Sequence, residues 1–176
     1  GVAVELHLAE CALDALGLSY EVLFVNDGSR DRSAALLADQ FHARPDVTRV
    51  VFCSGKVYFD LLEARRADEA RNVAIVRIEQ LYPFPSEDYA AALAHYPNAR
   101  EIVWCQEEPQ NQGAWYQIRH RLQDSLHGNQ ELLYSGRRPA AAPATGIPQL
   151  HSTEQHGLVA AAITASTQEQ SSRATP

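Results

Sequence analysis

The chain has 176 residues, of which 45% are apolar, and this is enough for one domain, or one and a half, with a real core. Its net charge of -7 argues against a nucleic-acid-binding surface, which is usually basic. No stretch approaches the roughly 20 apolar residues of a membrane span, and no charged-then-apolar segment at the start indicates a signal peptide.

Strand-like apolar runs alternate with helix-like patterns along the chain. The predicted strands lie at 21–27, 47–55, 72–80, 101–108 and 131–137. Apolar residues at helical spacing predict helices at 2–16, 30–42, 57–68, 87–96, 114–126 and 153–165. The runs are nearly continuous in apolar residues, which is typical of strands covered on both faces. We therefore predict an α/β three-layer fold with a mostly parallel sheet and an extra N-terminal α-β-α unit.

Three local signals refine these elements. Ser86 precedes two acids and is the predicted N-cap of the helix at 87–96, while Asn111 is a candidate cap for the helix that contains Trp115. The proline-rich segment 137–148 is predicted to be a loop. The polar end, 167–176, is predicted to be disordered.

Polar residues follow each predicted strand, at the edge where open α/β sheets bind their ligands. Ser54, Gly55 and Lys56 stand between a strand and a helix, where a helix N-terminus and a lysine could bind an anion. The alternative is an ordinary helix start with a lysine on the rim. The stretch lacks the full glycine-lysine frame of a P-loop.

The adjacent Glu107 and Glu108 end a buried strand. Neighbouring strand residues point to opposite faces, so the two carboxylates are not expected to share one proton as an acid/base pair. Pairing with arginines or a place in an interface are the alternatives, because polar groups at strand ends need partners. The candidate partners are Arg77, Arg119, Arg137 and Arg138.

Histidines and cysteines do not form a metal-binding pattern. His151, Glu154 and His156 are the closest cluster, but their spacing fits no standard zinc motif. The three cysteines are widely spaced, and two of them stand in apolar runs. Buried free thiols in a reducing cytoplasm are therefore expected, rather than disulfides, at Cys11, Cys53 and Cys105.

Four long motifs resemble a known family. They are "VVFCSGKVYFDLLEARR", "VAIVRIEQLYPFP", "YPNAREIVWCQEEPQNQGAW" and "GRRPAAAPATG" followed by H-x-x-EQ. Together they resemble the C-terminal domain of the first, thiamine-diphosphate-dependent component of 2-oxoglutarate dehydrogenase. The resemblance runs from about residue 47 to 166 and implies a transketolase-C-terminal-like fold.

The resemblance also implies a parent activity. That enzyme is an oxidoreductase of the tricarboxylic acid cycle, which decarboxylates 2-oxoglutarate and passes the succinyl group to a lipoyl arm. Thiamine diphosphate and magnesium bind to its two preceding domains, so no cofactor, metal or catalytic residue is expected here and the chain alone should be inactive. A role in homodimerisation and assembly with the lipoyl succinyltransferase component is implied instead.

The resemblance assigns two groups of residues. The structural or interface signature comprises Glu79, Gln80, Glu107, Glu108, Gln110, Asn111, Gly113 and Trp115. Some relatives also have an acetyl-CoA regulatory site lined by arginines. The candidate residues for such an anion or acetyl-CoA site are Lys56, Arg137 and Arg138.

The first part of the chain resembles a different family. "YEVLFVNDGSRDRS" is similar to the nucleotide-sugar-binding strand end of family 2 glycosyltransferases, which implies a nucleotide-sugar remnant at Asp27, Ser29 and Asp31. That family's opening strand, metal-binding motif and catalytic base are missing. The expected plan is a chimera, with a glycosyltransferase-like fragment at 1–46, the dehydrogenase-like domain at 47–166 and a tail at 167–176. A nucleotide-sugar binder and a folded chimera without activity remain the alternatives.

Overall fold

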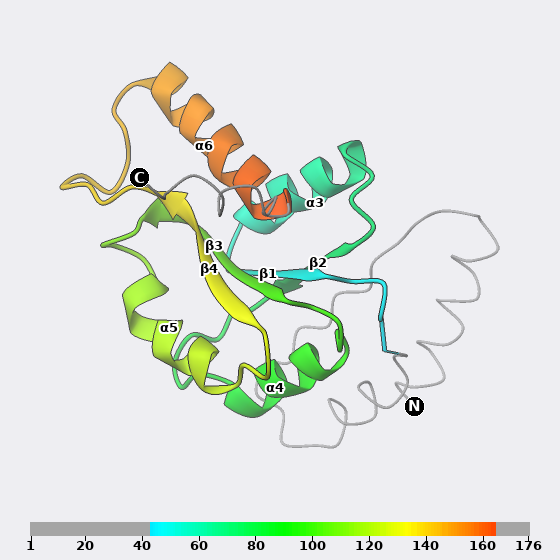
Figure 1. The fold of residues 1–176 in the computed structure, drawn as a ribbon. Helices are drawn as coiled ribbons and strands as arrows, with labels where there is room; N and C mark the ends of the chain where they lie inside the picture. Colours follow the sequence, from blue (N-terminus) through cyan, green and yellow to red (C-terminus); the bar gives the residue numbers. More distant parts are fainter. Residues whose placement is uncertain (1–42, 165–176) are drawn as a thin grey trace, which may run out of the picture.

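The computed structural model describes residues 43–164, which form a four-stranded parallel sheet with helices on both faces (Figure 1). In chain order the elements are β1 (Arg49–Cys53), α3 (Val57–Ala67), β2 (Val73–Arg77), α4 (Ser86–Ala94), β3 (Glu101–Pro109), α5 (Trp115–Asp124), β4 (Glu131–Arg137) and α6 (Pro148–Ile163). The strand order is β2-β1-β3-β4. The predicted α/β fold with a parallel sheet is confirmed, and it is consistent with a transketolase-C-terminal-like domain.

Several predictions fall outside the described residues. They are the N-terminal α-β-α unit, the nucleotide-sugar remnant at Asp27, Ser29 and Asp31, the thiol of Cys11 and the tail at 167–176. The domain boundaries at 46 and 166 therefore stay predictions.

The strands place alternate side chains on the two faces of the sheet. Phe52 of β1 lies beside Trp104 of β3 on the face covered by α4 and α5, where both side chains are at most 1% exposed. Cys53 and Cys105 are likewise register partners, on the face covered by α3 and α6. Both cysteines are buried and neither is in a disulfide, as predicted. At this position of the sheet, the core on the α4 and α5 face contains large aromatic side chains, and the core on the α3 and α6 face contains smaller ones.

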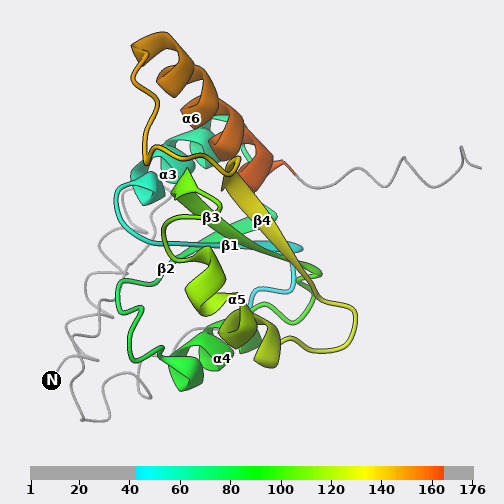
Figure 2. The ribbon, with the colours of Figure 1, turned by 90° about the vertical axis from the view of Figure 1, so that its left-hand side faces the viewer.

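Helix α6 lies across α3 and against the sheet (Figure 2). Its apolar residues Leu158, Val159, Ala162 and Ile163 are buried. Polar contacts add to this packing, because the hydroxyl of Ser135 donates a hydrogen bond of 2.7 Å to the Leu158 carbonyl. Within residues 43–164, no helix is both long and apolar enough to cross a bilayer.

Three helix starts differ from the sequence prediction. Ser86 is the first residue of α4 rather than its cap, and Pro85 precedes it without a side-chain capping bond. Asn111 does not cap α5, because its amide is engaged with Ala140. Helix α6 begins at Pro148 instead of near 153, since a proline is tolerated at the first helical position, where its missing N–H is not needed.

Candidate functional site

The carboxyl edge of the sheet contains a topological switch point. Helix α3 leaves β1 toward one face of the sheet, and α5 leaves β3 toward the other, although β1 and β3 are neighbours. Open α/β sheets bind ligands at such a crevice. A cavity of about 510 Å³ opens there, between the turn after β1, the segment after β2, the end of β3 and the start of α5. This is the candidate functional site.

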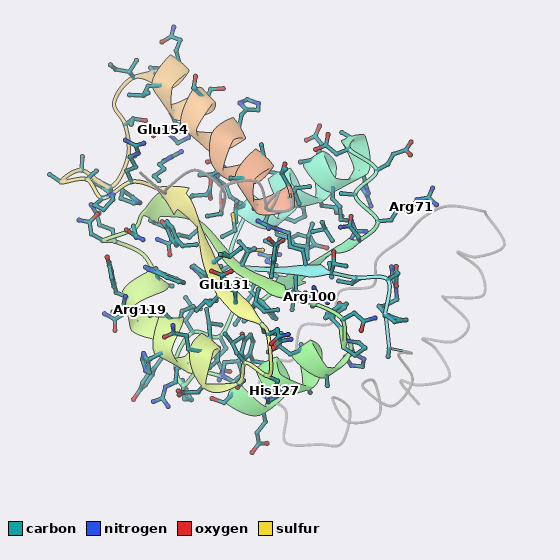
Figure 3. All side chains as sticks on the ribbon, in the orientation of Figure 1. Arg71, Arg100, Arg119, His127, Glu131 and Glu154 are labelled. Atoms are coloured by element: carbon teal, nitrogen blue, oxygen red, sulfur yellow. The ribbon has the colours of Figure 1, made fainter. Side chains whose placement is uncertain are left out.

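A wider hollow of about 1150 Å³ lies at the amino edge of the sheet, among the turns that precede the strands. Arg100, His127 and Glu131 line it, and His127 lies at the end of the molecule opposite to Glu154 of α6 (Figure 3). The C-termini of α4 and α5 face this hollow, so the helix dipoles present carbonyl groups there rather than amide donors. We place the site at the carboxyl edge, where helix N-termini and strand-end polar residues converge.

Gln106 organises the wall of the carboxyl-edge cavity. This residue is only 3% exposed, and its side-chain oxygen accepts hydrogen bonds from the Trp104 indole (2.9 Å) and the Trp115 backbone N–H (3.0 Å). Its amide nitrogen donates to the carbonyls of Glu108, Pro109 and Gln112. The buried amide is thereby satisfied, and the loop between β3 and α5 is held in one conformation.

Glu107 and Glu108 diverge, as strand alternation predicts. Glu107 points toward α6 and pairs with Lys56 and with the Gln155 amide (3.0 Å). Glu108 lies against Gly113, on the α5 side, and makes no ion pair with any other described residue. The predicted pairing of Glu107 with an arginine is therefore wrong, because its cation is Lys56, whereas Arg77 pairs with Glu79 and Arg137 with Glu154.

The turn after β1 forms a helix start. Gly55 has a φ of +74°, a conformation that glycine adopts without strain, and its N–H donates to Glu79 Oε1 at 3.0 Å. Arg77 also pairs with Glu79. Lys56 precedes the first residue of α3 and is exposed. The amide that could have bound an external anion is thus occupied by a carboxylate of the chain itself.

Arg137, the last residue of β4, is 7% exposed. Its Nη2 donates to Gln155 Oε1 at 3.1 Å and lies 3.4 Å from His151 Nε2. Its Nε is 3.3 Å from Glu154 Oε2, an ion-pair distance. The geometry is wrong for a hydrogen bond, however, so both of these buried atoms lack a hydrogen-bond partner. Such an orphaned pair is uncommon in a folded interior.

The three predicted anion-binding residues are only partly brought together. Arg137 is buried, whereas the neighbouring Arg138 is exposed. Lys56 connects to Arg137 indirectly, through Glu107 and then Gln155. Lys56 and Arg137 are thus linked through a carboxylate and an amide, and do not form a cluster of three free cations with Arg138.

The remaining residues of the predicted signature have local roles. Asn111 both donates to and accepts from the backbone of Ala140, and the Gln110 N–H donates to the Arg137 carbonyl at 3.0 Å. The Gln80 amide donates to the Pro83 carbonyl at 2.8 Å. Trp115 is 8% exposed and contacts the Tyr134 ring, so it anchors α5 in the core.

Burial changes the acidity of two groups near the site. It raises the pKa of Tyr134 to about 12, with smaller contributions from Cys105 and Glu108. Burial also raises the pKa of Cys105, so this thiol stays protonated and is a poor nucleophile. Across residues 43–164, no three His, Cys, Asp or Glu side chains are grouped so as to hold a metal ion.

Sequence reasoning missed three residues that organise this region: Arg49, Gln106 and Gln155. Gln106 continues an apolar strand run, and a polar residue at such a position was a usable signal of a buried hydrogen-bonding hub. Gln155 was part of the H-x-x-EQ motif but received no role. Arg49 offered no local signal, since its partners are Glu101, 52 residues further along the chain, and two carbonyls of α6, 112 and 113 residues further.

The fold and this edge define an open α/β domain with a parallel sheet and a cavity at its switch point. The family model described as 2-oxoglutarate dehydrogenase C-terminal matches residues 30–163, so the chain belongs to this family. The match begins upstream of residue 47, inside the segment predicted to be glycosyltransferase-like, and it does not test that resemblance.

Curated relatives agree with this family. The chain is 53% identical over 118 residues to the 2-oxoglutarate dehydrogenase E1 component of Haemophilus influenzae, covering 67% of this chain and 13% of that protein. It is 51% identical over 117 residues to the E1 component of Cupriavidus necator, covering 66% and 12%. For the E1 component of Coxiella burnetii the identity is 49% over 124 residues, covering 69% and 13%. The chain thus matches about an eighth of the length of these relatives.

Proposed function

We propose that the chain acts as the C-terminal assembly domain of a 2-oxoglutarate dehydrogenase E1-type enzyme. Membership of the family carries this proposal. The parent enzyme would decarboxylate 2-oxoglutarate with thiamine diphosphate bound elsewhere and would deliver the succinyl group to a lipoyl partner. The chain itself would contribute subunit contacts and would make a homodimer.

The distribution of exposed apolar side chains supports an assembly role. The large exposed ones among the described residues are Phe59, Tyr82, Tyr116, Ile147 and Leu150, which are between 45% and 93% exposed. Each lies in the segment after a strand or near the start of the helix that follows it. In a parallel sheet these positions share the carboxyl edge, and exposed apolar residues gathered on one edge favour a protein contact.

Domain replacement tests this function. The matching C-terminal segment of the Haemophilus influenzae E1 component would be exchanged for residues 47–164 of this chain, and 2-oxoglutarate-dependent turnover and dimerisation would be compared with the segment deletion. We expect the replacement to restore both properties and the deletion to lose both. A replacement that is folded but no more active or dimeric than the deletion would contradict the assembly role.

A regulatory role is a second candidate, favoured by the orphaned guanidinium nitrogen of Arg137. An anion such as acetyl-CoA would have to compete with Glu107 for Lys56 and with Glu154 for Arg137. Titration calorimetry with acetyl-CoA tests this candidate. We expect saturable heat that Arg137→Met abolishes and that the exposed-site variant Arg66→Met retains, whereas absence of heat at millimolar ligand would remove the candidate.

A further inference from the structure

The cavity at the switch point has a composition that the assembly role does not explain. Its floor is formed by the buried Trp104 and Ile118, and Leu81 and Ala114 add further apolar surface. Its volume of about 510 Å³ falls within the range of about 300–1,000 Å³ that is usual for small-molecule sites. A ligand with an apolar portion would therefore fit the inner part of the cavity.

The charge of the lining is one-sided. Glu107 and Glu108 both line the cavity, and among the described residues that line it none is a lysine, arginine or histidine. Lys56, which does not line the cavity, forms an ion pair with Glu107 and neutralises its charge. Glu108 is exposed and forms no ion pair with another described residue, so one carboxylate at the cavity is available to an incoming cation.

The rim adds an aromatic group. Tyr82 follows β2, lines the cavity and is 93% exposed. An exposed aromatic face beside a carboxylate attracts an organic cation, because the ring quadrupole and the negative charge act on it together. An anionic ligand would meet two carboxylates at the same place and would be repelled.

We propose that this cavity binds an ammonium or guanidinium group carried on an apolar stem. The stem would lie against Leu81, Ile118 and Trp104, and the cationic group would meet Glu108 and Tyr82. A free alkylamine with one cationic end, or the lysine or arginine side chain of a second copy of the chain, has this chemistry. The proposal rests on the cavity, and it stands or falls independently of the assembly role.

Titration calorimetry of the full chain with n-pentylamine tests the proposal, with n-pentanol as an uncharged probe and valerate as an anionic one. We expect saturable binding of n-pentylamine alone. Glu108→Gln should weaken it roughly tenfold, since a charge-assisted contact is lost. Tyr82→Ala should weaken it by about threefold. Both side chains are exposed, so neither variant removes a buried core contact.

Glu131→Gln is the matched control, because Glu131 is an exposed glutamate that lines the hollow at the opposite edge. It should leave n-pentylamine binding unchanged. The proposal is overturned if n-pentylamine does not bind saturably, if pentanol or valerate binds equally well, or if Glu131→Gln weakens binding as much as Glu108→Gln does.

Sedimentation with and without n-pentylamine distinguishes the two sources of the cation. If n-pentylamine binds and promotes dissociation of a dimer, the cavity holds a basic side chain of the second copy. If n-pentylamine binds and the sedimentation is unchanged, the cavity serves a free amine. Each result supports the cation site, and only the first connects it to assembly.

Discussion

Two buried arginines connect α6 to opposite edges of the sheet, and they differ in how well they are satisfied. Arg49 begins β1 at the amino edge, donates to the carbonyls of Ala162 (2.7 Å) and Ala161 (2.8 Å), and pairs with Glu101 at 2.6 Å. Arg137 ends β4 at the carboxyl edge and leaves its Nε without a hydrogen bond.

This difference in hydrogen bonding suggests different roles for the two edges of the sheet, one in stability and the other in interaction. The guanidinium of Arg49 meets the last turn of α6, where carbonyl groups lack helical partners and a cation is favoured by the helix dipole. All three guanidinium nitrogens of Arg49 therefore have hydrogen-bond partners. The carboxyl edge combines an incompletely bonded arginine, exposed aromatic residues and a cavity. We infer that the amino edge stabilises the fold and that the carboxyl edge receives partners.

The largest expected effect is at Arg49. Arg49→Met should lower the free energy of unfolding by about 3 kcal/mol, because it removes the ion pair with Glu101 and the hydrogen bonds to the carbonyls of Ala161 and Ala162. Urea denaturation measures this loss. Arg100→Met is the control, since Arg100 is exposed at the same edge and its replacement should cost less than about 0.5 kcal/mol. Equal losses in both variants would contradict the assigned role of Arg49.

A smaller loss is expected at Arg137. Arg137→Met should cost about 1–2 kcal/mol in the same assay, because Glu154 is 34% exposed and can be hydrated once its partner is removed. Arg138→Met, at the adjacent exposed position, should be close to neutral. The comparison between the two edges fails if Arg137→Met is as costly as Arg49→Met.

Tyr134 gives a pH-dependent test of the carboxyl edge. Burial raises its pKa from its ordinary value of 10 to about 12, so in alkali the unfolded state loses this proton first. Its contribution to stability should therefore be present below pH 10 and should decline between pH 10 and about 12. The difference between the wild type and Tyr134→Phe, measured by denaturation across this range, isolates the effect. If the free energy of unfolding depends on pH in the same way for both proteins, burial of Tyr134 does not contribute to stability in this range.

The positions of the strands and helices could be predicted from the sequence because these elements depend on local patterns of apolar residues. Continuous apolar runs such as the one at 101–108 specify strands that are covered on both faces, and these were located correctly. The divergence of Glu107 from Glu108 also follows from strand alternation alone. Trp115 could be assigned to the core from its helical spacing.

The pairing of charged residues could not be predicted in the same way. The amide of Gln155 meets Asp60 at 2.7 Å and Glu107 at 3.0 Å, across 95 and 48 residues of sequence. Which of several nearby cations meets Glu107 depends on how α6 and α3 pack, and sequence spacing does not encode that packing. The helix start at Ser86 was misplaced for a local reason, because Pro85 already sets the entry of the chain into α4.

Tyr82 provides the most direct test of the central claim that the carboxyl edge receives partners. Because this side chain is 93% exposed, Tyr82→Asp should leave the free energy of unfolding within about 0.5 kcal/mol of the wild type. Asn129→Asp adds the same charge at an exposed position of the amino edge and is the control.

Sedimentation equilibrium of the three proteins is the decisive measurement. Our account predicts a dimer for the wild type and for Asn129→Asp, and a monomer, or association at least tenfold weaker, for Tyr82→Asp. A wild-type chain that stays monomeric, or a Tyr82→Asp chain that associates as strongly as the wild type, would contradict it.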